Sequence, residues 1–183
     1  MSVSADKVAT RVAYGKTLLE LGEVNGNVVV MDADLSKSTM TADFAKKFPE
    51  RFVQMGISEQ DMMSTAAGIA STGKTVFVST FAVFATGRAW EQVRNSIAYP
   101  QMNVKICATH SGVTVGEDGG SHQSVEDIAL MRVIPNMKVI VPSDAVSTRW
   151  AVKEAFKVNG PVYVRLGRLA VPAVYDEDEQ FEF

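Results

Sequence analysis

The sequence predicts an α/β fold, a three-layer αβα sandwich around a mostly parallel six-stranded sheet. Six short runs rich in valine and isoleucine are apolar at nearly every position, as strands are when helices cover both faces of a sheet. Helical patterns separate these runs, so strand and helix alternate along the chain. The composition, 46% hydrophobic and 21% charged, is typical of a globular domain with one sizeable core.

Each apolar run is short enough for a strand and follows a longer helical pattern, the order that right-handed crossovers require. The six predicted strands are "NVVVMD" (27–32), "RFVQM" (51–55), "TVFVST" (75–80), "NVKICAT" (103–109), "MKVIVPS" (137–143) and "PVYVRL" (161–166). The six predicted helices cover residues 5–21, 42–47, 59–71, 82–98, 125–133 and 145–158.

Residues 1–172 are expected to form one domain, followed by an acidic linker or tail at 173–183. The formal net charge is -3, and five of the last eight residues are acidic. This balance favours neither a nucleic-acid surface nor a membrane surface. The N-terminus lacks the apolar core of a signal peptide and no apolar stretch is long enough to span a bilayer, so we expect a cytoplasmic protein.

Cys107 lies inside an apolar strand and is expected to be buried as a small hydrophobic residue. A single cysteine provides neither a disulfide framework nor a cysteine-based metal site. No metal site is predicted, because the two histidines of the chain lack helical spacing.

Polar residues follow the predicted strands, at the edge where ligands bind in open parallel sheets. They are Asp34, Ser38, Glu59, His110, Glu117, Asp118, His122 and Arg168. A solvated loop region is also polar, so this clustering marks a candidate site without fixing its chemistry.

Glu59 stands in the first turn of a predicted helix, which Ser58 is able to cap. One interpretation is compensation of the helix dipole, and the other is a carboxylate that faces a ligand. Phe81 and Phe84 lie three residues apart on one helical face and fit either the core or a slot for a flat ligand. Trp90 is expected in the core.

Both histidines lie in "THSGVTVGEDGGSHQ" (109–123), together with four glycines and Asp118. The glycine spacing matches neither a dinucleotide fingerprint nor a P-loop. Two histidines around an aspartate suit proton transfer or phosphate contact near neutral pH, although loop histidines are often without function. No G-x-S-x-G elbow follows a strand, which argues against a serine hydrolase.

Four stretches, "GISEQDM", "STFAVFATGRAWEQVRNSI", "ATHSGVTVGEDGGSHQSVEDIALMRVIPNMKVIVPSDA" and "VRLGRLAVP", resemble the pyrimidine-binding domain of transketolases, above all the C-terminal subunit of split transketolases. The resemblance covers residues 6–172. It implies a thiamine-diphosphate-binding fold, thiamine diphosphate as cofactor, and transfer of a two-carbon ketol unit between sugar phosphates.

The resemblance also implies roles for individual residues. Glu59 matches the catalytic glutamate that hydrogen-bonds the aminopyrimidine and promotes its imino tautomer. Phe81 and Phe84 match the aromatic pocket around that ring, and Asp34 matches an aspartate at the cofactor end of the dimer interface.

The same resemblance implies which residues line the substrate channel. His110 matches a histidine toward the acceptor phosphate and His122 one near the reacting hydroxyls, and both are expected to take part in catalysis. Asp118 matches the residue that reads hydroxyl stereochemistry. Three further residues match or complete a phosphate site: Arg168, Arg11 and Ser38.

Three nearby residues are not assigned a role in the site. Arg88 and Arg94 are interpreted as helix-surface or interface charges. Gly87 departs from the family pattern, because full-length transketolases commonly carry a third pocket aromatic there, and the glycine leaves that wall to another residue or chain.

Nothing in the chain resembles the motif that holds magnesium and the diphosphate in this family. The resemblance therefore implies a partner, an N-terminal diphosphate-binding subunit that carries the magnesium, and a homo-oligomer, expected to be a dimer. The chain resembles one domain of three and is expected to be inactive alone.

Other interpretations remain open. Deoxyxylulose-phosphate synthases and 2-oxo acid dehydrogenase β subunits share this domain, although Glu117 in "GEDGGSHQ" favours a transketolase. A non-catalytic interaction module and a receiver-like domain phosphorylated on Asp32 or Asp34 are the alternatives from other classes.

Overall fold

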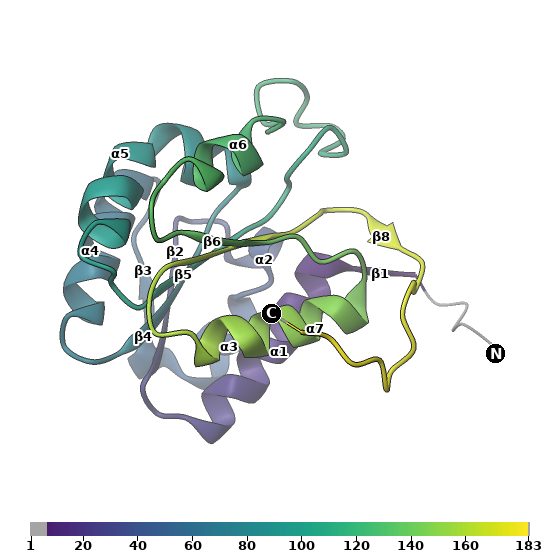
Figure 1. Cartoon of the computed structure of the whole chain (residues 1–183), viewed down its shortest axis with the longest axis horizontal. Coiled ribbons are helices and arrows are strands. Elements are labelled where there is room, and N and C mark those ends of the chain that lie inside the picture. Colours follow the sequence, from purple (N-terminus) through teal and green to yellow (C-terminus); the bar gives the residue numbers. More distant parts are fainter. Residues whose placement is uncertain (1–6, 183) are drawn as a thin grey trace.

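The computed structural model describes residues 7–182 and contains a six-stranded sheet in the order β3-β2-β4-β5-β7-β6, with every neighbouring pair parallel (Figure 1). All six predicted strands are confirmed: β2 (Val28–Asp32), β3 (Phe52–Gln54), β4 (Thr75–Ser79), β5 (Val104–Ala108), β6 (Lys138–Ile140) and β7 (Val162–Arg165). The carboxyl ends of these strands therefore meet at one edge.

Helices cover both faces of the sheet, which confirms the predicted three layers. One face is covered by α1 (Thr10–Val24), α3 (Ala42–Lys47) and α7 (Ala145–Lys157), the other by α4 (Glu59–Ala70), α5 (Trp90–Gln92) and α6 (Asp127–Arg132) (Figure 1). Successive strand residues alternate between the two layers, so Val76 and Val78 pack under α4 while Phe77 packs under α1.

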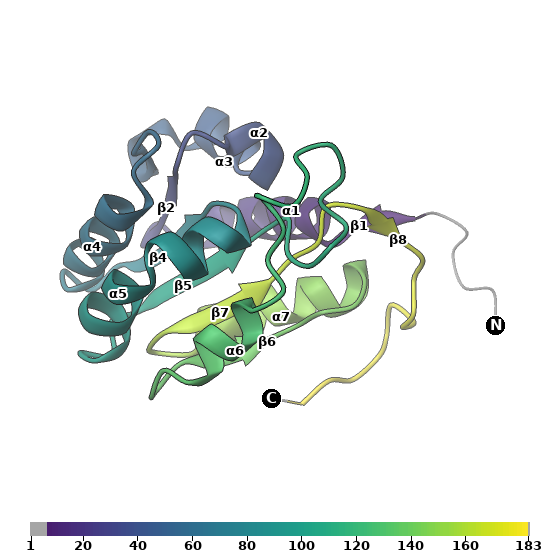
Figure 2. The ribbon, with the colours of Figure 1, turned by 90° about the horizontal axis from the view of Figure 1, so that it is seen from above.

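The first predicted helix begins later than expected. Residues 5–6 lie outside the described part of the chain, and β1 (Val8–Ala9) pairs antiparallel with β8 (Ala170–Val171) before α1 starts. This two-stranded sheet was not predicted, because two residues carry no periodicity. It brings the start of α1 beside the segment after β7 (Figure 2). Two short helices were also missed: α2 (Ser36–Thr39) and the 3-10 turn η1 (Pro49–Arg51).

The predicted helix 82–98 is helical but not a regular α-helix. Two π-helical segments, η2 (Phe84–Arg88) and η3 (Val93–Ala98), flank α5. The amide of Ala89 donates to the Phe84 carbonyl at 3.1 Å, one residue further back than in an α-helix. This wider turn sets the direction of the Arg88 side chain.

Two further predictions are decided by the packing. Cys107 is fully buried as expected, and burial raises the pKa of its thiol to about 12. Trp90 is only partly buried, packs against the core under α4, and donates from Nε1 to the Leu130 carbonyl at 3.0 Å.

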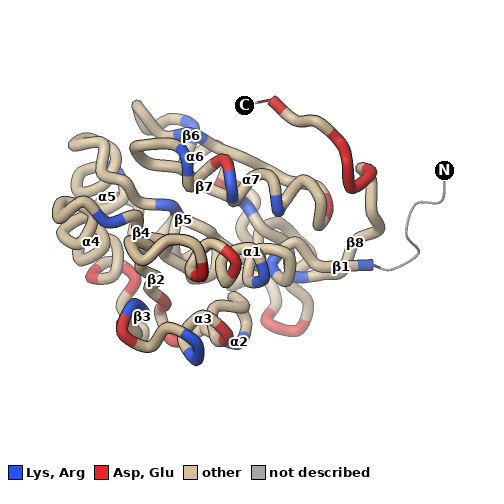
Figure 3. Tube along the Cα trace, turned by 90° about the horizontal axis from the view of Figure 1, so that it is seen from below, with Lys and Arg blue, Asp and Glu red and all other residues tan. Residues whose placement is uncertain are grey.

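The acidic C-terminal segment runs back along the fold, where Asp144 Oδ2 accepts the amides of Val174 and Tyr175 at 2.8 and 2.9 Å. Figure 3 shows the Asp and Glu residues of this segment along the chain near the C-terminus, and Lys and Arg residues spread over several elements. The division at residue 172 stays a prediction. Within residues 7–182, none of the helices is both long and apolar enough to cross a membrane.

Candidate functional site

The two histidines of the chain meet at one aromatic pair beyond β4 and β5. Phe81 and Phe84 are stacked, with ring centroids 6.0 Å apart and planes inclined by 10°. His110 stacks on Phe81 at 3.8 Å, and His122 presents its edge to Phe84 at 5.5 Å and to Phe81 at 6.3 Å. The chain thus brings four flat side chains into one cluster, here called the aromatic slot.

The end of β5 determines where His110 lies. Thr109 continues the parallel pairing past the strand: its amide donates to Thr80 O at 3.0 Å and its carbonyl accepts the Ala82 amide at 2.8 Å. His110 then takes a left-handed φ of 57°, an unusual conformation for a residue other than glycine, which turns the chain into the loop. Its ring is 2% exposed and packs over Phe81.

His110 is held as a neutral imidazole. Burial lowers its pKa to about 4, and the nearby guanidinium groups of Arg11 and Arg168 act in the same direction, while Asp118 acts in the opposite one. Its Nδ1 shares a hydrogen bond with Thr109 Oγ1 at 2.9 Å. A neutral ring carries one nitrogen with a free lone pair, which is able to accept a hydrogen bond.

The glycine-rich loop folds back over the slot. Gly112 and Ser124 form an antiparallel bridge that closes it, and Gly112, Gly116 and Gly119 all have positive φ. At Gly116 an added Cβ would collide with the Arg168 guanidinium, which itself donates to the Val115 carbonyl. The positive φ favours glycine there, while the Arg168 side chain is flexible enough to move aside.

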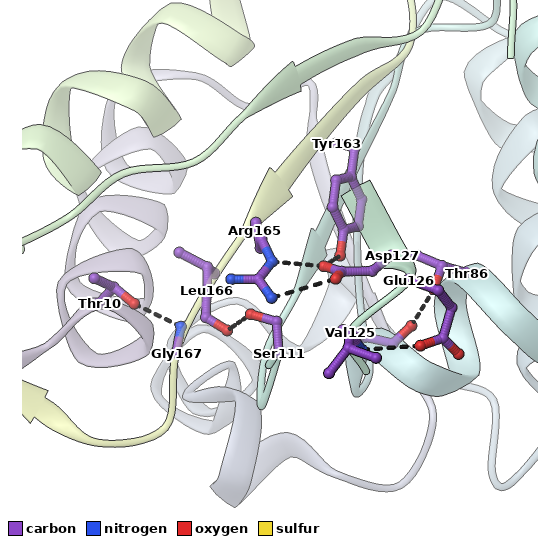
Figure 4. Close-up of polar contacts among 11 residues, drawn as sticks. Thr10, Thr86, Ser111, Val125, Glu126, Asp127, Tyr163, Arg165, Leu166 and Gly167 are labelled. Carbon is purple, nitrogen blue, oxygen red and sulfur yellow. Dashed lines mark hydrogen bonds and ion pairs between the residues drawn. The ribbon is translucent and has the colours of Figure 1, made fainter. Parts of the chain in front are cut away.

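A buried network anchors the base of this loop (Figure 4). Asp127, the first residue of α6, accepts hydrogen bonds from Tyr163 Oη and Arg165 Nε, each at 2.8 Å, and from Arg165 Nη2 at 3.3 Å. Burial, followed by the Asp127 charge, raises the pKa of Tyr163 well above its usual value. On the other side Ser111 Oγ donates to the Leu166 carbonyl at 2.6 Å, so the loop is held at both ends.

Two arginines lie together at the start of α1 and after β7. Arg11 Nη1 donates to the Ser38 carbonyl at 2.7 Å and Nε to the Arg168 carbonyl at 3.2 Å. Burial and the charge of Arg168 lower the pKa of Arg11. Neither guanidinium forms an ion pair with a carboxylate among residues 7–182. Ser38 contributes its carbonyl here, and the pair is suited to an anion such as phosphate.

Glu59 begins α4 and is 1% exposed. Its Oε2 accepts a hydrogen bond from Arg88 Nη1 at 2.8 Å and its Oε1 one from Thr80 Oγ1 at 3.4 Å. The predicted cap from Ser58 is wrong, because Ser58 Oγ donates to the Met55 carbonyl instead. Glu59 is thus a buried carboxylate beside the aromatic slot.

Arg88 was interpreted from the sequence as a helix-surface or interface charge; it is exposed at the end of η2 as expected, but it also contacts the site, which was not predicted. Its guanidinium pairs with Glu59 and lies over the Phe84 ring at 4.5 Å. Arg94 does match the same prediction: it is exposed, bonds to Asn95 and lies at 5.9 Å over Trp90. Sequence reasoning missed the contacts of Thr80 and Arg88 with Glu59, because they join residues 21 and 29 positions apart.

The remaining predicted residues are exposed at the surface. Asp118 and Glu117 are exposed on the loop. Asp34 is exposed with a φ of 64°, and its amide donates to Gln54 Oε1 at 2.7 Å. It lines a separate cavity of about 260 Å³ with residues 35–38 and Gln54.

Asp32 is fully buried, and its carboxylate accepts hydrogen bonds from Leu35 N at 2.6 Å and from Thr39 Oγ1 and Thr41 Oγ1 at 2.6 and 3.0 Å. Burial raises its pKa. These bonds assign Asp32 to the turn after β2 and leave it inaccessible to a phosphodonor, against the receiver-like interpretation.

The side chains of this site are suited to the pyrimidine ring of thiamine diphosphate. The aromatic slot is suited to a flat heterocycle, and the buried Glu59 is able to bond to a ring nitrogen. No group of three or more His, Cys, Asp or Glu side chains suited to a metal occurs within the described residues.

Comparisons with known proteins identify the family. The family model described as "Transketolase, pyrimidine binding domain" matches residues 6–173. A putative transketolase C-terminal section of Methanocaldococcus jannaschii is 56% identical over 94% of this chain and 55% of its own length. One subunit of an apulose-4-phosphate transketolase of Phocaeicola vulgatus is 44% identical over 96% of this chain and 56% of its length.

A solved structure described as a split-gene transketolase, inactive β4 tetramer, is 60% identical, with a TM-score of 0.86 over 97% of this chain and 57% of that chain. The chain thus spans about half the length of these relatives. A match over nearly all of the chain at this identity establishes the family, and the chain belongs to the transketolase pyrimidine-binding domain family.

Proposed function

We propose that the chain supplies the pyrimidine-binding part of a thiamine-diphosphate-dependent transketolase, which transfers a two-carbon ketol unit between sugar phosphates. The observation that carries the proposal is the buried Glu59 carboxylate at the edge of the aromatic slot. Bound thiamine diphosphate would supply the thiazolium carbon that carries the two-carbon unit.

The residues of the slot have separate tasks. Glu59 shares a proton with the pyrimidine ring nitrogen and so favours the tautomer that is able to act as a base. Phe81 and Phe84 stack on the ring and exclude water. Asp34 is assigned to the cofactor end of the site, where its exposed side chain is open to a second subunit.

The substrate is bound by the loop and by the arginines. His110, neutral at physiological pH, and His122 accept and return protons at the sugar hydroxyls. Asp118 reads hydroxyl configuration from the loop. Arg11 and Arg168, with Ser38 behind them, bind the phosphate, since guanidinium groups match phosphate oxygens.

The chain needs further parts for this reaction. We assign the diphosphate and magnesium to an N-terminal subunit, since the relative from Methanocaldococcus jannaschii is described as the C-terminal section of a transketolase. We place the enzyme in the cytoplasm, as a homo-oligomer of the two-subunit unit, with sugar phosphates of the pentose phosphate pathway as substrates.

The test is ketol transfer by the chain combined with its N-terminal subunit, thiamine diphosphate and magnesium. Glu59→Gln is expected to lower kcat by about 10²-fold or more, because it removes the proton that is shared with the ring. Asp61→Asn is the matched control, since Asp61 lies exposed in the same helical turn. Full activity of Glu59→Gln, or none in the unmodified complex, would contradict the proposal.

A further inference from the structure

The guanidinium of Arg88 takes both contacts that the slot offers to a flat, hydrogen-bonding ligand. Its Nη1 lies 2.8 Å from Glu59 Oε2, and its carbon Cζ lies 4.5 Å from the centroid of Phe84. A guanidinium is planar and carries N–H donors, as an aminopyrimidine does. Arg88 therefore presents to Glu59 and Phe84 the same kind of surface as the proposed cofactor ring.

The backbone explains how Arg88 reaches the slot. The π turn of η2 inserts an extra residue between Phe84 and Ala89, and Arg88 lies at the end of that turn, four residues after Phe84. Gly87, the residue before Arg88, is exposed, and a Cβ built on it faces open space.

Arg88 is the exposed partner of the ion pair with Glu59. Its side chain is 46% exposed, whereas Glu59 is 1% exposed, so the arginine is able to swing into water while the carboxylate stays in place. Among residues 7–182, the Arg88 side chain forms no other hydrogen bond or ion pair. The contact is thus one that an incoming ligand is able to replace.

We propose that Arg88 acts as an internal ligand of the pyrimidine site: it holds Glu59 and Phe84 while the site is free and is displaced when the cofactor's aminopyrimidine binds. The inference rests on the proposed function and adds a residue that sets cofactor affinity. Binding must break the Arg88 contacts. The measured binding constant is therefore that of the open slot multiplied by the fraction of molecules in which the slot is open.

The expected size follows from the two contacts. The ion pair and the cation–π contact both depend on the half-exposed Arg88 guanidinium, which water partly screens, and together they correspond to a change in affinity of about three- to thirty-fold. Arg88→Ala should therefore tighten thiamine diphosphate binding by about tenfold within that range.

The experiment measures the Kd of thiamine diphosphate by calorimetry, with magnesium present, for the chain in complex with its N-terminal subunit. Arg88→Ala is compared with the unmodified chain and with Arg94→Ala, which removes the same charge from an exposed position of the same helical region. Arg88→Gln, which keeps hydrogen-bond donors without the charge, should show a smaller gain and replaces the alanine variant if that one does not fold. Inorganic pyrophosphate is the second probe, because it lacks the pyrimidine.

The proposal predicts tighter thiamine diphosphate binding for the Arg88 variants only, with pyrophosphate binding unchanged. If the unmodified complex binds thiamine diphosphate and Arg88→Ala binds it equally well or more weakly, the proposal is overturned. Arg88 would then only line the site. An equal gain in Arg94→Ala, or an equal gain for pyrophosphate, would also overturn it, since general charge would then explain the effect. If the unmodified complex binds no thiamine diphosphate, the proposed function fails and the inference fails with it.

Discussion

The Asp127 network should dominate the stability of the loop base, and Asp127→Asn tests this. Asp127 is fully buried and receives three hydrogen bonds, two of them from Arg165. The asparagine keeps the shape and one acceptor oxygen but leaves the guanidinium without its counter-charge. Arg165 is 22% exposed, so water recovers only a small part of the loss.

Removal of one partner of a buried pair commonly costs about 3–5 kcal/mol, and the partial exposure of Arg165 and the remaining acceptor reduce the expected loss here to about 2–3 kcal/mol. For a domain of this size that corresponds to a decrease in Tm of roughly 4–12 °C. Thermal and urea unfolding followed by circular dichroism measure both quantities. Tyr163→Phe, which keeps the ion pair, should cost only about 1 kcal/mol. A loss below about 0.5 kcal/mol in Asp127→Asn would refute the reasoning.

Three further outcomes are expected. The His110 ring should titrate near pH 4 by NMR; because this pKa lies below the usual 6.5, the unfolded chain binds more protons between these values, and stability should fall as the pH drops from about 6.5 to 4, less so in His110→Gln. A ring that titrates near 6.5 would contradict its burial. Lys105 is fully buried, and its amine donates to the carbonyl oxygens of Val158 and Gly160, each at 2.6 Å. Burial lowers the pKa of Lys105 to about 7, below the usual 10.5. Stability should therefore rise between pH 7 and 9, and Lys105→Met should flatten that rise; an unchanged slope in urea unfolding would argue against it. Gly116→Ala should lose about 1–3 kcal/mol because of its positive φ, whereas Gly26→Ala, which meets nothing within 4 Å, should change little.

The strands of the sheet were predictable because each one is buried on both faces and is therefore apolar throughout. The same reasoning could not find β1 and β8, whose pairing depends on residues more than 150 positions apart, Val8 and Val171. The π turn between Phe84 and Arg88 was also not predictable, since five residues are too few for hydrophobic periodicity to distinguish a π turn from an α turn.

Most residues of the candidate site were predictable from the sequence, but the contacts between them were not. Glu59, His110 and the phenylalanines follow strands whose carboxyl ends meet, so their proximity follows from the topology. The contact between Arg88 and Glu59 depends on one extra residue in a helical turn, and the sequence contains no signal for it. The tasks of these residues in catalysis remain predictions.

The most direct test is a crystal structure of the chain in complex with its N-terminal subunit, magnesium and thiamine diphosphate. The account predicts a carboxyl oxygen of Glu59 about 3 Å from the pyrimidine ring nitrogen, with the ring against Phe81 and Phe84 and the Arg88 guanidinium no longer on Glu59. A cofactor whose pyrimidine lies outside the aromatic slot, with Glu59 still paired to Arg88, would contradict it.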